Sequence, residues 1–373
     1  MSLQDLAKSH PTPFLAVSRR TLSENFHQLK SALPVSGIHF AVKSNPDVAV
    51  LRVLAELGAK FEIASTYELD VLQEIGVEPA EILYSNPVKS AASVRLAYTA
   101  GVRTYAVDSF SEIEKISENA PGSNIYIRLL VNDFSSKIPL SKKFGIHPSE
   151  AVDAAVYAVD RGLVPLGLTF HVGSQCTSTD LWDFALQSCG KVMRALLEKN
   201  IRLHALNIGG GFPVEYNEPV PEIGEIGVVL ERAMSEYLPY KIHLLAEPGR
   251  YLVAEAGTLI TSVIARSVRS GKNWIYTDTS AFHGLLETMP CQGQIQYPIA
   301  VLGDDNDDGS RRKARYIITG PTCDYLDTYA NNVLLPIDVA ENSLLAISVT
   351  GAYTVPFASY FNGFPPPKVV LYD

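Results

Sequence analysis

The side chains best suited to chemistry in this 373-residue chain stand where short apolar runs end. Lys43 follows one such run, His171 ends another and Glu247 ends a third. An amine held in a partly apolar site can form a Schiff base with a carbonyl compound. Each residue alone has a plainer explanation, since a lysine at the end of a strand is usually a solvated cap. Their chemistry therefore depends on whether the fold brings them together.

The pattern of apolar residues predicts how they are positioned. Eight strand-like runs occupy residues 38–43, 60–65, 82–85, 104–109, 124–131, 164–172, 202–210 and 241–249. Helical spacing of apolar residues separates them, at 47–57, 67–75, 89–100, 111–118, 147–161, 179–199 and 224–238, after a first helix at 20–33. Only residues 132–146 break the alternation, and we expect a loop there. Eight strands alternating with helices predict a TIM-like (β/α)₈ barrel.

The character of the chain changes after residue 256. Apolar, β-branched runs at 258–265, 274–277, 298–302, 314–318, 332–336, 344–349 and 368–372 are joined by turns. They predict a second, all-β domain over residues 257–373, which the N-terminal segment 1–19, with a strand at 12–17, is expected to join. The fold class is therefore α/β plus all-β, with the barrel over residues 20–256. The loop 303–313 is rich in charge, and we expect a solvated hairpin turn.

Polar residues gather at the predicted strand ends, where a (β/α)₈ barrel places its active site. They are Lys43, Glu62, Asn86, Asp108, Arg128, His171, the triplet Gly209-Gly210-Gly211, and Glu247 to Arg250. So many at one rim are unlikely to be coincidental. We therefore expect the rim to be a binding site.

These residue types match one cofactor. Three consecutive glycines, 209–211, let backbone N–H groups approach a phosphate, and Arg250 adds positive charge. Glu247 could accept a hydrogen bond from a protonated ring nitrogen, and His171 offers a flat face for stacking on the ring. Lys43 supplies an amine that forms an imine. A phosphate, a ring nitrogen and an imine-forming lysine together describe pyridoxal 5′-phosphate.

Composition excludes several other functions. The formal charge is −9 with no basic run, which argues against nucleic acid as a partner. No apolar stretch approaches membrane-spanning length, and no signal-peptide pattern opens the chain. The cysteines at 176, 189, 291 and 323 form neither a metal-binding pattern nor a disulfide framework. We expect a soluble, cytoplasmic protein without a metal site.

Motifs along almost the whole chain resemble the fold-type III pyridoxal-phosphate decarboxylases, and most closely their ornithine and lysine decarboxylase branch. The matching motifs are Phe-Ala-Val-Lys (40–43), Phe-Glu-Ile-Ala-Ser (61–65), Tyr-Ser-Asn-Pro-Val-Lys (84–89), Val-Asp-Ser (107–109), Lys-Phe-Gly (143–145), Phe-His-Val-Gly-Ser (170–174), Ile-Gly-Gly-Gly-Phe-Pro (208–213), Ala-Glu-Pro-Gly-Arg-Tyr (246–251), Gly-Pro-Thr-Cys-Asp (320–324), Gly-Ala-Tyr-Thr (351–354) and Phe-Asn-Gly-Phe (361–364). The resemblance implies an alanine racemase-like pair of domains and decarboxylation of ornithine or lysine to the diamine, as in polyamine biosynthesis.

The resemblance also implies roles for individual residues. Lys43 is the Schiff-base lysine, Glu247 the partner of the pyridine nitrogen and His171 the stacking residue. The residues implied at the phosphate are Ser174, Gly210, Gly211, Gly249, Arg250 and Tyr353. Cys323 corresponds to the catalytic thiol and Asp324 to a ligand of the substrate's distal amine. In relatives these last two reach the site from the other subunit, so a homodimer with shared sites is implied.

Three positions depart from the family's pattern. Asn207 stands where relatives commonly carry aspartate, which we expect to affect support of the glycine loop more than the chemistry. Gln175 is more typical of diaminopimelate decarboxylases. Met289-Pro290 replaces a tyrosine–aspartate pair that holds the distal amine in ornithine decarboxylases, and either Glu287 or His283 is a candidate substitute. The last departure bears on the substrate and leaves the reaction type unchanged.

Four alternatives remain open. A diaminopimelate decarboxylase would bind a second carboxylate, which Asp324 would repel, and a decarboxylase of a specialised amino acid would fit the altered 279–290 segment. A non-catalytic homologue that regulates a partner would have no need of Lys43, Glu247 and Cys323. A racemase typically pairs the ring nitrogen with arginine, whereas Glu247 favours decarboxylation.

Overall fold

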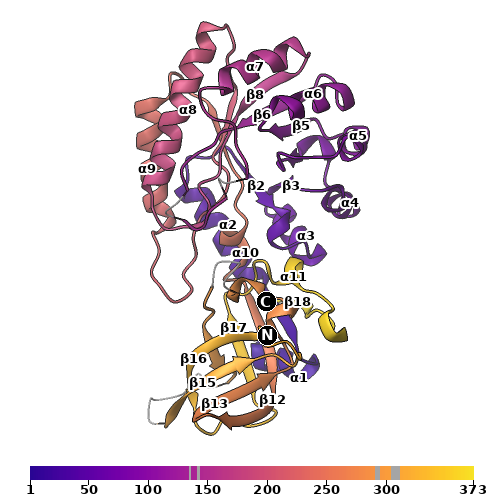
Figure 1. Cartoon of the computed structure of the whole chain (residues 1–373), viewed down its shortest axis with the longest axis vertical. Helices are drawn as coiled ribbons and strands as arrows, with labels where there is room; N and C mark the ends of the chain where they lie inside the picture. The colour runs from indigo at the N-terminus through magenta and orange to yellow at the C-terminus, as the bar shows by residue number, and fades with distance from the viewer. Residues whose placement is uncertain (134–135, 141–142, 290–294, 304–310) are drawn as a thin grey trace. The chain divides into compact units, whose positions relative to one another are not determined.

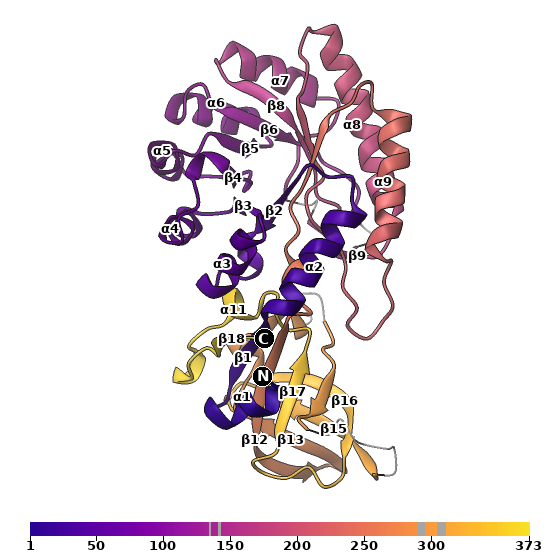
Figure 2. The ribbon, with the colours of Figure 1, turned by 180° about the vertical axis from the view of Figure 1, so that it is seen from behind.

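The computed structural model describes residues 1–133, 136–140, 143–289, 295–303 and 311–373. The chain divides into two compact units (Figures 1 and 2). The barrel unit comprises Glu24–Pro213 and Val220–Tyr251, and the β unit comprises Met1–Ser23, Val214–Pro219 and Leu252–Asp373. The predicted fold class, a (β/α)₈ barrel plus a separate β domain, is confirmed by this architecture.

Eight parallel strands close the barrel in the order β10-β11-β2-β3-β4-β5-β6-β8. They are β2 (Gly37–Ala41), β3 (Lys60–Ile63), β4 (Leu83–Tyr84), β5 (Thr104–Val107), β6 (Asn124–Arg128), β8 (Val164–Thr169), β10 (Ala205–Asn207) and β11 (His243–Ala246). Figure 1 shows their helices around the outside. A side chain at Gly167 would lie 2.0 Å from the carbonyl oxygen of Ala205 and 2.7 Å from the ring of Tyr126. This glycine therefore makes room for Tyr126 inside the barrel.

The helices match the predicted periodic segments to within a few residues. They are α2 (Arg19–Ala32), α3 (Val48–Glu56), α4 (Thr66–Glu74), α5 (Ala91–Ala100), α6 (Phe110–Asn119), α7 (Ala151–Asp160), α8 (Asp180–Glu198) and α9 (Ile223–Tyr237). Side-chain caps set several of their starts, as at Asp47, whose carboxylate accepts the N–H groups of Ala49 and Val50. The short helices α1 (Leu3–Ser9), α10 (Arg250–Val253) and α11 (Thr354–Phe357) were not predicted.

The sequence overestimates the length of most barrel strands. Strand β2 ends at Ala41, and Lys43 lies in the 3₁₀ turn η1 (Val42–Ser44) that follows. Strand β8 ends two residues before His171. The backbone must leave the hydrogen-bonded ladder at the rim to reach the next helix, although its residues remain apolar. The candidate site residues consequently stand on turns just beyond the strands.

The expectation of a loop at 132–146 was partly wrong. Strand β7 (Ser136–Ile138) lies within it and pairs antiparallel with β9 (Ser174–Cys176). Gly173 explains the close approach, because a side chain there would meet the Ser136 hydroxyl at 2.0 Å. Periodicity cannot identify a strand of three residues.

The β unit is built on an eight-stranded sheet. Its strands are β1 (Phe14–Ser18), β12 (Gly257–Arg269), β13 (Lys272–Thr277), β14 (Ile299–Val301), β15 (Lys313–Thr319), β16 (Thr328–Pro336), β17 (Leu344–Ser348) and β18 (Lys368–Tyr372). Six follow the order β14-β17-β12-β13-β15-β16, and β1 pairs with β12 and β18. The two termini meet beside β18, where the Met1 amino group donates to the Asp373 backbone oxygen (Figure 2). All eight of these strands overlap a predicted run, including β1 with the strand expected at 12–17. The hairpin expected at 303–313 lies mostly outside the described residues.

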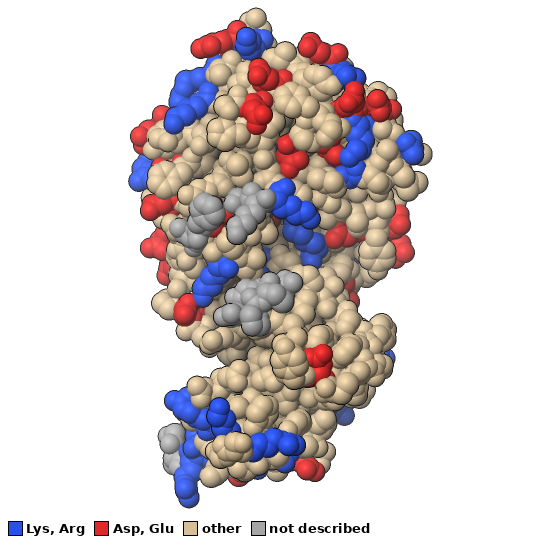
Figure 3. Space-filling model, in the orientation of Figure 1, with Lys and Arg blue, Asp and Glu red and all other residues tan. Residues whose placement is uncertain are grey.

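Charged side chains of both signs are interspersed over the barrel unit on the face drawn in Figure 3. Within the described ranges, no helix is both long and apolar enough to cross a bilayer.

Candidate active site

The Lys43 amine is paired with a buried carboxylate at the barrel rim. Its Nζ lies 2.7 Å from Oε1 of Glu62 on the neighbouring strand β3. The Lys43 side chain is 46% exposed, whereas that of Glu62 is 1% exposed. A buried carboxylate needs a partner for its charge, and Lys43 provides one. The arrangement leaves the amine accessible and its position fixed.

Glu247 follows β11 and is held by two neighbouring side chains. Its Oε1 accepts hydrogen bonds from the Ser85 hydroxyl and, at 2.7 Å, from Nδ2 of Asn207. Asn207 also accepts the N–H of Gly209 at 2.9 Å. Asn207 thus supports the glycine loop, as expected, and it also donates directly to Glu247. Both of these donors bind Oε1, which leaves Oε2 the better placed oxygen for a further donor.

Burial raises the pKa of Glu247, and the negative charge of Glu62 raises it further. The hydrogen bond from Ser85, the charge of Lys43 and the hydrogen bond from Asn207 act in the opposite direction. A carboxylate in these surroundings gains much from a positively charged donor that reaches it. Glu247 is therefore suited to bind a protonated ring nitrogen.

Arg128, the last residue of β6, stands among the acidic residues of the rim. Its guanidinium lies over the Phe144 ring, 5.1 Å from the centroid. Burial lowers its pKa, while Glu247, Asp108 and Glu62 raise it. Asp108 in turn accepts the N–H of Gly145 at 2.9 Å. Arg128 therefore offsets part of the negative charge that the buried carboxylates concentrate here.

His171 is held as a neutral ring. Burial lowers its pKa well below the usual value, and the positive charges of Arg128 and Lys43 lower it further. Its Nδ1 lies 3.0 Å from the N–H of Gly173 and accepts that hydrogen bond, so the proton of the neutral ring is on Nε2. A neutral imidazole with a fixed tautomer can stack on an aromatic ring without charge repulsion.

The glycine loop forms a cradle for an anion. A side chain at Gly210 would lie 2.5 Å from the Glu247 carbonyl oxygen and 3.5 Å from His171 Nε2. Gly209 has a positive φ of 64°, which favours glycine. The buried Arg250 donates to the Ser174 hydroxyl at 3.4 Å, which brings a charge and a second donor into the same unit. These donors, the accessible Lys43 amine and the Glu247 carboxylate fit pyridoxal 5′-phosphate.

Glu68 is a partly buried acid beside this site that sequence reasoning missed. It lies on α4, and its Oε2 accepts the N–H of Ala64 at 2.6 Å. Burial raises its pKa from 4.5 to about 7, and the charge of Glu62 contributes in the same direction. The folded chain thus binds this proton more tightly than the unfolded chain, so stability falls as pH rises from 4.5 to about 7.

We therefore expect Glu68→Gln to stabilise the protein above neutral pH. The glutamine keeps an oxygen for the Ala64 N–H and has no charge to bury. The free energy of unfolding should rise by at most ~3 kcal/mol at alkaline pH and much less in acid. Denaturant unfolding across this pH range measures the effect, with the exposed Glu74→Gln on the same helix as control. An equal shift at all pH values would show that Glu68 is not the titrating group.

The β unit carries the remaining predicted residues. Cys323 is exposed, and its Sγ donates to Oδ1 of Asn362 at 3.3 Å. Asp324 Oδ1 accepts the N–H of Leu326 at 2.8 Å. Tyr353 precedes α11 with a positive φ of 62° and stacks on Phe357. These three predicted residues therefore lie on turns of the β unit.

The two candidate substitutes for the distal-amine pair are both buried in the β unit. Glu287 is 4% exposed and lies 3.5 Å from the Tyr297 hydroxyl, which donates to it. His283 is 1% exposed, and its Nε2 lies 3.1 Å from the carbonyl oxygen of Phe361. His283 thus joins two segments of this unit. The role of Glu287 in binding substrate stays a prediction, and Pro290 lies outside the described residues.

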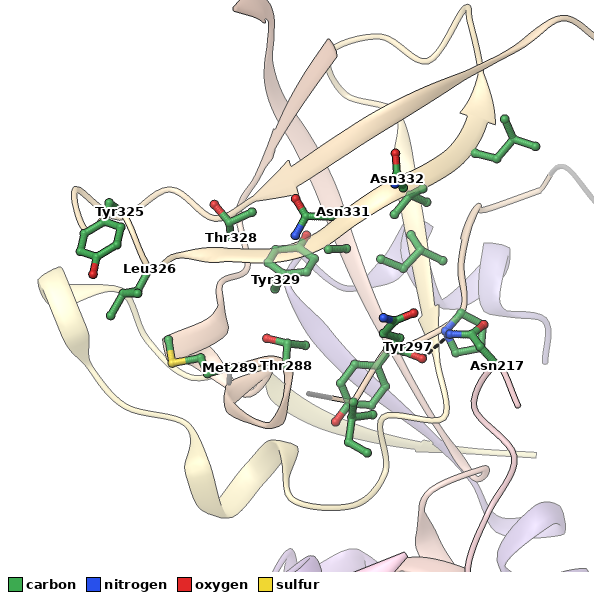
Figure 4. Close-up of a pocket in the computed structure, with 17 residues that line it drawn as sticks. Asn217, Thr288, Met289, Tyr297, Tyr325, Leu326, Thr328, Tyr329, Asn331 and Asn332 are labelled. Carbon is green, nitrogen blue, oxygen red and sulfur yellow. Dashed lines mark hydrogen bonds between the residues drawn. The ribbon is translucent and has the colours of Figure 1, made fainter. Parts of the chain in front are cut away.

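A pocket of about 880 Å³ adjoins the turn that carries Cys323 and Asp324 (Figure 4). Tyr325 and Leu326 form part of its wall, with Met289, Tyr297 and residues 328–334 of β16. Tyr325 is 86% exposed. This part of the β unit therefore presents apolar surface next to the candidate thiol.

Histidine, cysteine, aspartate and glutamate form no metal-binding group among the residues that the structure describes.

Comparison with known proteins identifies the family of the chain and its cofactor. Residues 19–254 match the family model of the pyridoxal-dependent decarboxylases, pyridoxal binding domain. The chain therefore belongs to the pyridoxal-dependent decarboxylases, and the predicted family and cofactor are confirmed.

Relatives cover nearly the whole chain. A lysine/ornithine decarboxylase of Selenomonas ruminantium is 32% identical over 100% of this chain and 92% of its own length. Solved structures of a lysine/ornithine decarboxylase from Vibrio vulnificus, complexed with putrescine and with cadaverine, both have a TM-score of 0.90. They are 31% and 30% identical over 100% of this chain and 97% and 95% of theirs. Antizyme inhibitor 2 of Xenopus laevis is also 32% identical, over 89% of this chain and 75% of its own length.

Proposed function

We propose that the chain is a carboxy-lyase that decarboxylates a basic L-amino acid, ornithine or lysine, to the corresponding diamine. The observation that carries this proposal is the Lys43–Glu62 pair beside the hydrogen-bonded Glu247 at one barrel rim. The relatives complexed with putrescine and cadaverine support the same substrate class. Within the cell we propose a cytoplasmic location and a place in polyamine biosynthesis.

The barrel residues hold the cofactor in this proposal. Lys43 would supply the amine for the Schiff base, and Gly210, Gly211, Gly249 and Arg250 would hold the phosphate with Ser174 and Tyr353. The neutral His171 would stack on the ring. When bound, pyridoxal 5′-phosphate accepts the electron pair that the departing carboxylate leaves behind. Glu247 keeps the ring nitrogen protonated, which strengthens this electron acceptance. Ser85 and Asn207 support that role because they help to keep Glu247 ionised despite its burial.

Two residues of the β unit complete the proposed site. Cys323 delivers a proton to Cα of the substrate after carbon dioxide leaves. Asp324 binds the ammonium group at the far end of the substrate, where opposite charges attract strongly if water is excluded. A diaminopimelate decarboxylase is disfavoured, because Asp324 would repel a second carboxylate.

We propose further that the active form is a homodimer whose subunits share their sites. Exposed apolar side chains near Cys323 support this: Tyr325 is 86%, Leu326 45% and Tyr360 72% exposed. Exposed apolar side chains gathered in one region of a surface mark interaction sites. In the dimer, Cys323 and Asp324 of one subunit would serve Lys43 of the other.

Mixing two inactive variants tests the shared site. Lys43→Ala and Cys323→Ala, each weak alone, should recover activity together, because heterodimers contain one intact site. Random exchange makes half the dimers heterodimeric, so about a quarter of wild-type activity should return. Exchange is verified with differently tagged subunits. If exchange occurs without recovery, each site is built from one chain.

The substrate is tested by incubating the cofactor-loaded protein with a panel of amino acids and measuring amine products by mass spectrometry. We expect putrescine from ornithine or cadaverine from lysine as the main product. Conversion of diaminopimelate or of a neutral amino acid alone would contradict the proposed substrate class.

A further inference from the structure

Cys323 donates hydrogen bonds to Asn362, a residue to which no functional role was predicted. Oδ1 of Asn362 accepts two hydrogen bonds from Cys323, one from the backbone N–H at 3.1 Å and one from Sγ at 3.3 Å. The two residues are 39 positions apart. Asn362 has a positive φ of 55°, a conformation that asparagine tolerates better than most residues. Its short side chain reaches Cys323 from this one backbone position.

The backbone around Asn362 is itself held in place. Phe282 lies on the altered segment 279–290, and its carbonyl oxygen accepts the N–H of Ser359 at 2.9 Å and the Ser359 hydroxyl at 3.0 Å. The rings of Phe282 and Phe361 lie 4.7 Å apart, and His283 bonds the Phe361 carbonyl oxygen. Four contacts therefore fix the turn 359–362 on the segment at 281–283.

The same segment is joined to the turn that carries Cys323. The carboxylate of Asp327, fully buried, accepts the N–H of Ala281 at 2.9 Å. It also accepts the N–H of Thr322 at 3.1 Å and the Thr322 hydroxyl at 2.6 Å. Cys323 is thus connected to Asn362 twice, directly and through Asp327 and residues 281–283.

We propose that Asn362 is a positioning residue that holds the Cys323 thiol in a fixed place and orientation. The inference rests on the proposed function, in which Cys323 gives a proton to Cα. The amide oxygen of Asn362 accepts the S–H of Cys323, so the proton that Cys323 gives is held at a fixed place. The second hydrogen bond, from the backbone N–H of Cys323, holds the Cys323 backbone and so fixes the position of the thiol.

Alkylation of Cys323 by iodoacetamide tests the inference, because only the thiolate reacts. The rate is followed across neutral and alkaline pH on the holoenzyme, and the Cys323 peptide is quantified by mass spectrometry. Asn362→Gly accommodates the positive φ and removes the oxygen, so alkylation at a fixed subsaturating pH should be about fivefold faster. Asn362→Asp keeps an acceptor and adds charge, so alkylation should be slower than in the wild type. Asn342→Gly, an exposed asparagine with a φ of 66°, is the control and should change nothing.

Catalysis supplies the second readout. Asn362→Gly should lower kcat about tenfold or more with little change in KM, and Asn362→Asp should restore part of kcat. Wild-type alkylation rates in both Asn362 variants would overturn the inference, whatever happens to activity. Because alkylation does not require turnover, a wild type that fails to decarboxylate would refute the proposed function without deciding the role of Asn362.

Discussion

Replacing Lys43 with alanine should abolish the visible absorption of the lysine-bound cofactor and reduce kcat by roughly three orders of magnitude. The amine is fixed 2.7 Å from Glu62 at the barrel rim, and it is the group proposed to form the imine. Removing it also leaves the buried Glu62 without its described partner, which adds a cost in stability. Absorption spectra and steady-state kinetics of the purified variant measure both effects.

Lys43→Arg separates the two contributions of the lysine. Arginine restores a positive charge for Glu62 but cannot form a Schiff base under these conditions. Its activity and visible absorption should be as low as those of Lys43→Ala, while its free energy of unfolding should be closer to that of the wild type. Lys60→Ala, which removes an exposed ion pair with Glu81, is the matched control on β3. Appreciable turnover by Lys43→Arg would show that the imine is not required.

The second large effect is expected at Asp324. If its carboxylate binds the distal ammonium group of the substrate, Asp324→Asn leaves that charge uncompensated, which typically costs about 3–5 kcal/mol in a buried pair. The value of kcat/KM for a diamino acid should fall by roughly two to three orders of magnitude. Cofactor affinity should stay unchanged, because Asp324 does not bind the cofactor in this proposal.

The kcat/KM of Glu287→Gln for a diamino acid provides a companion measurement. It shows whether the altered segment 279–290 supplies a second contact to the substrate, although Glu287 is only 4% exposed in the β unit. A preference for diamino acids that survives Asp324→Asn would show that Asp324 does not select the substrate. A neutral or acidic amino acid would then be the better candidate.

Periodicity was enough to predict the fold because both units repeat simple patterns. Apolar runs with intervening helical spacing specify the eight strands of the barrel, and β-branched runs specify most strands of the β unit. The ends of the barrel strands were wrong because the chain stays apolar after it leaves the ladder. Strand β7 and helix α1 were missed because short segments carry too few periodic positions to be recognised.

The contacts that organise the candidate site could not be predicted in the same way. Ser85 and Glu247 are 162 residues apart and meet only because the barrel closes. Asn207 was expected to support the loop, but its bond to Glu247 depends on the register of β10 and β11. Asp327 has no local feature that marks it, and the Phe-Asn-Gly-Phe motif that contains Asn362 gives no sign of its contact with Cys323, because each residue acts on a turn elsewhere in the chain. Residue types therefore identified the chemistry, and only the fold identified the supporting residues.

Turnover of carboxyl-¹³C-labelled ornithine and lysine by the cofactor-loaded protein is the most direct test of decarboxylation. We predict that labelled carbon dioxide and the diamine appear in equal amounts and that Lys43→Ala releases neither at a comparable rate. An amino acid recovered as its mirror image with the label retained would identify a racemase. A loaded protein that binds these substrates and releases no labelled carbon dioxide from any member of the panel would show that the chain does not decarboxylate basic amino acids.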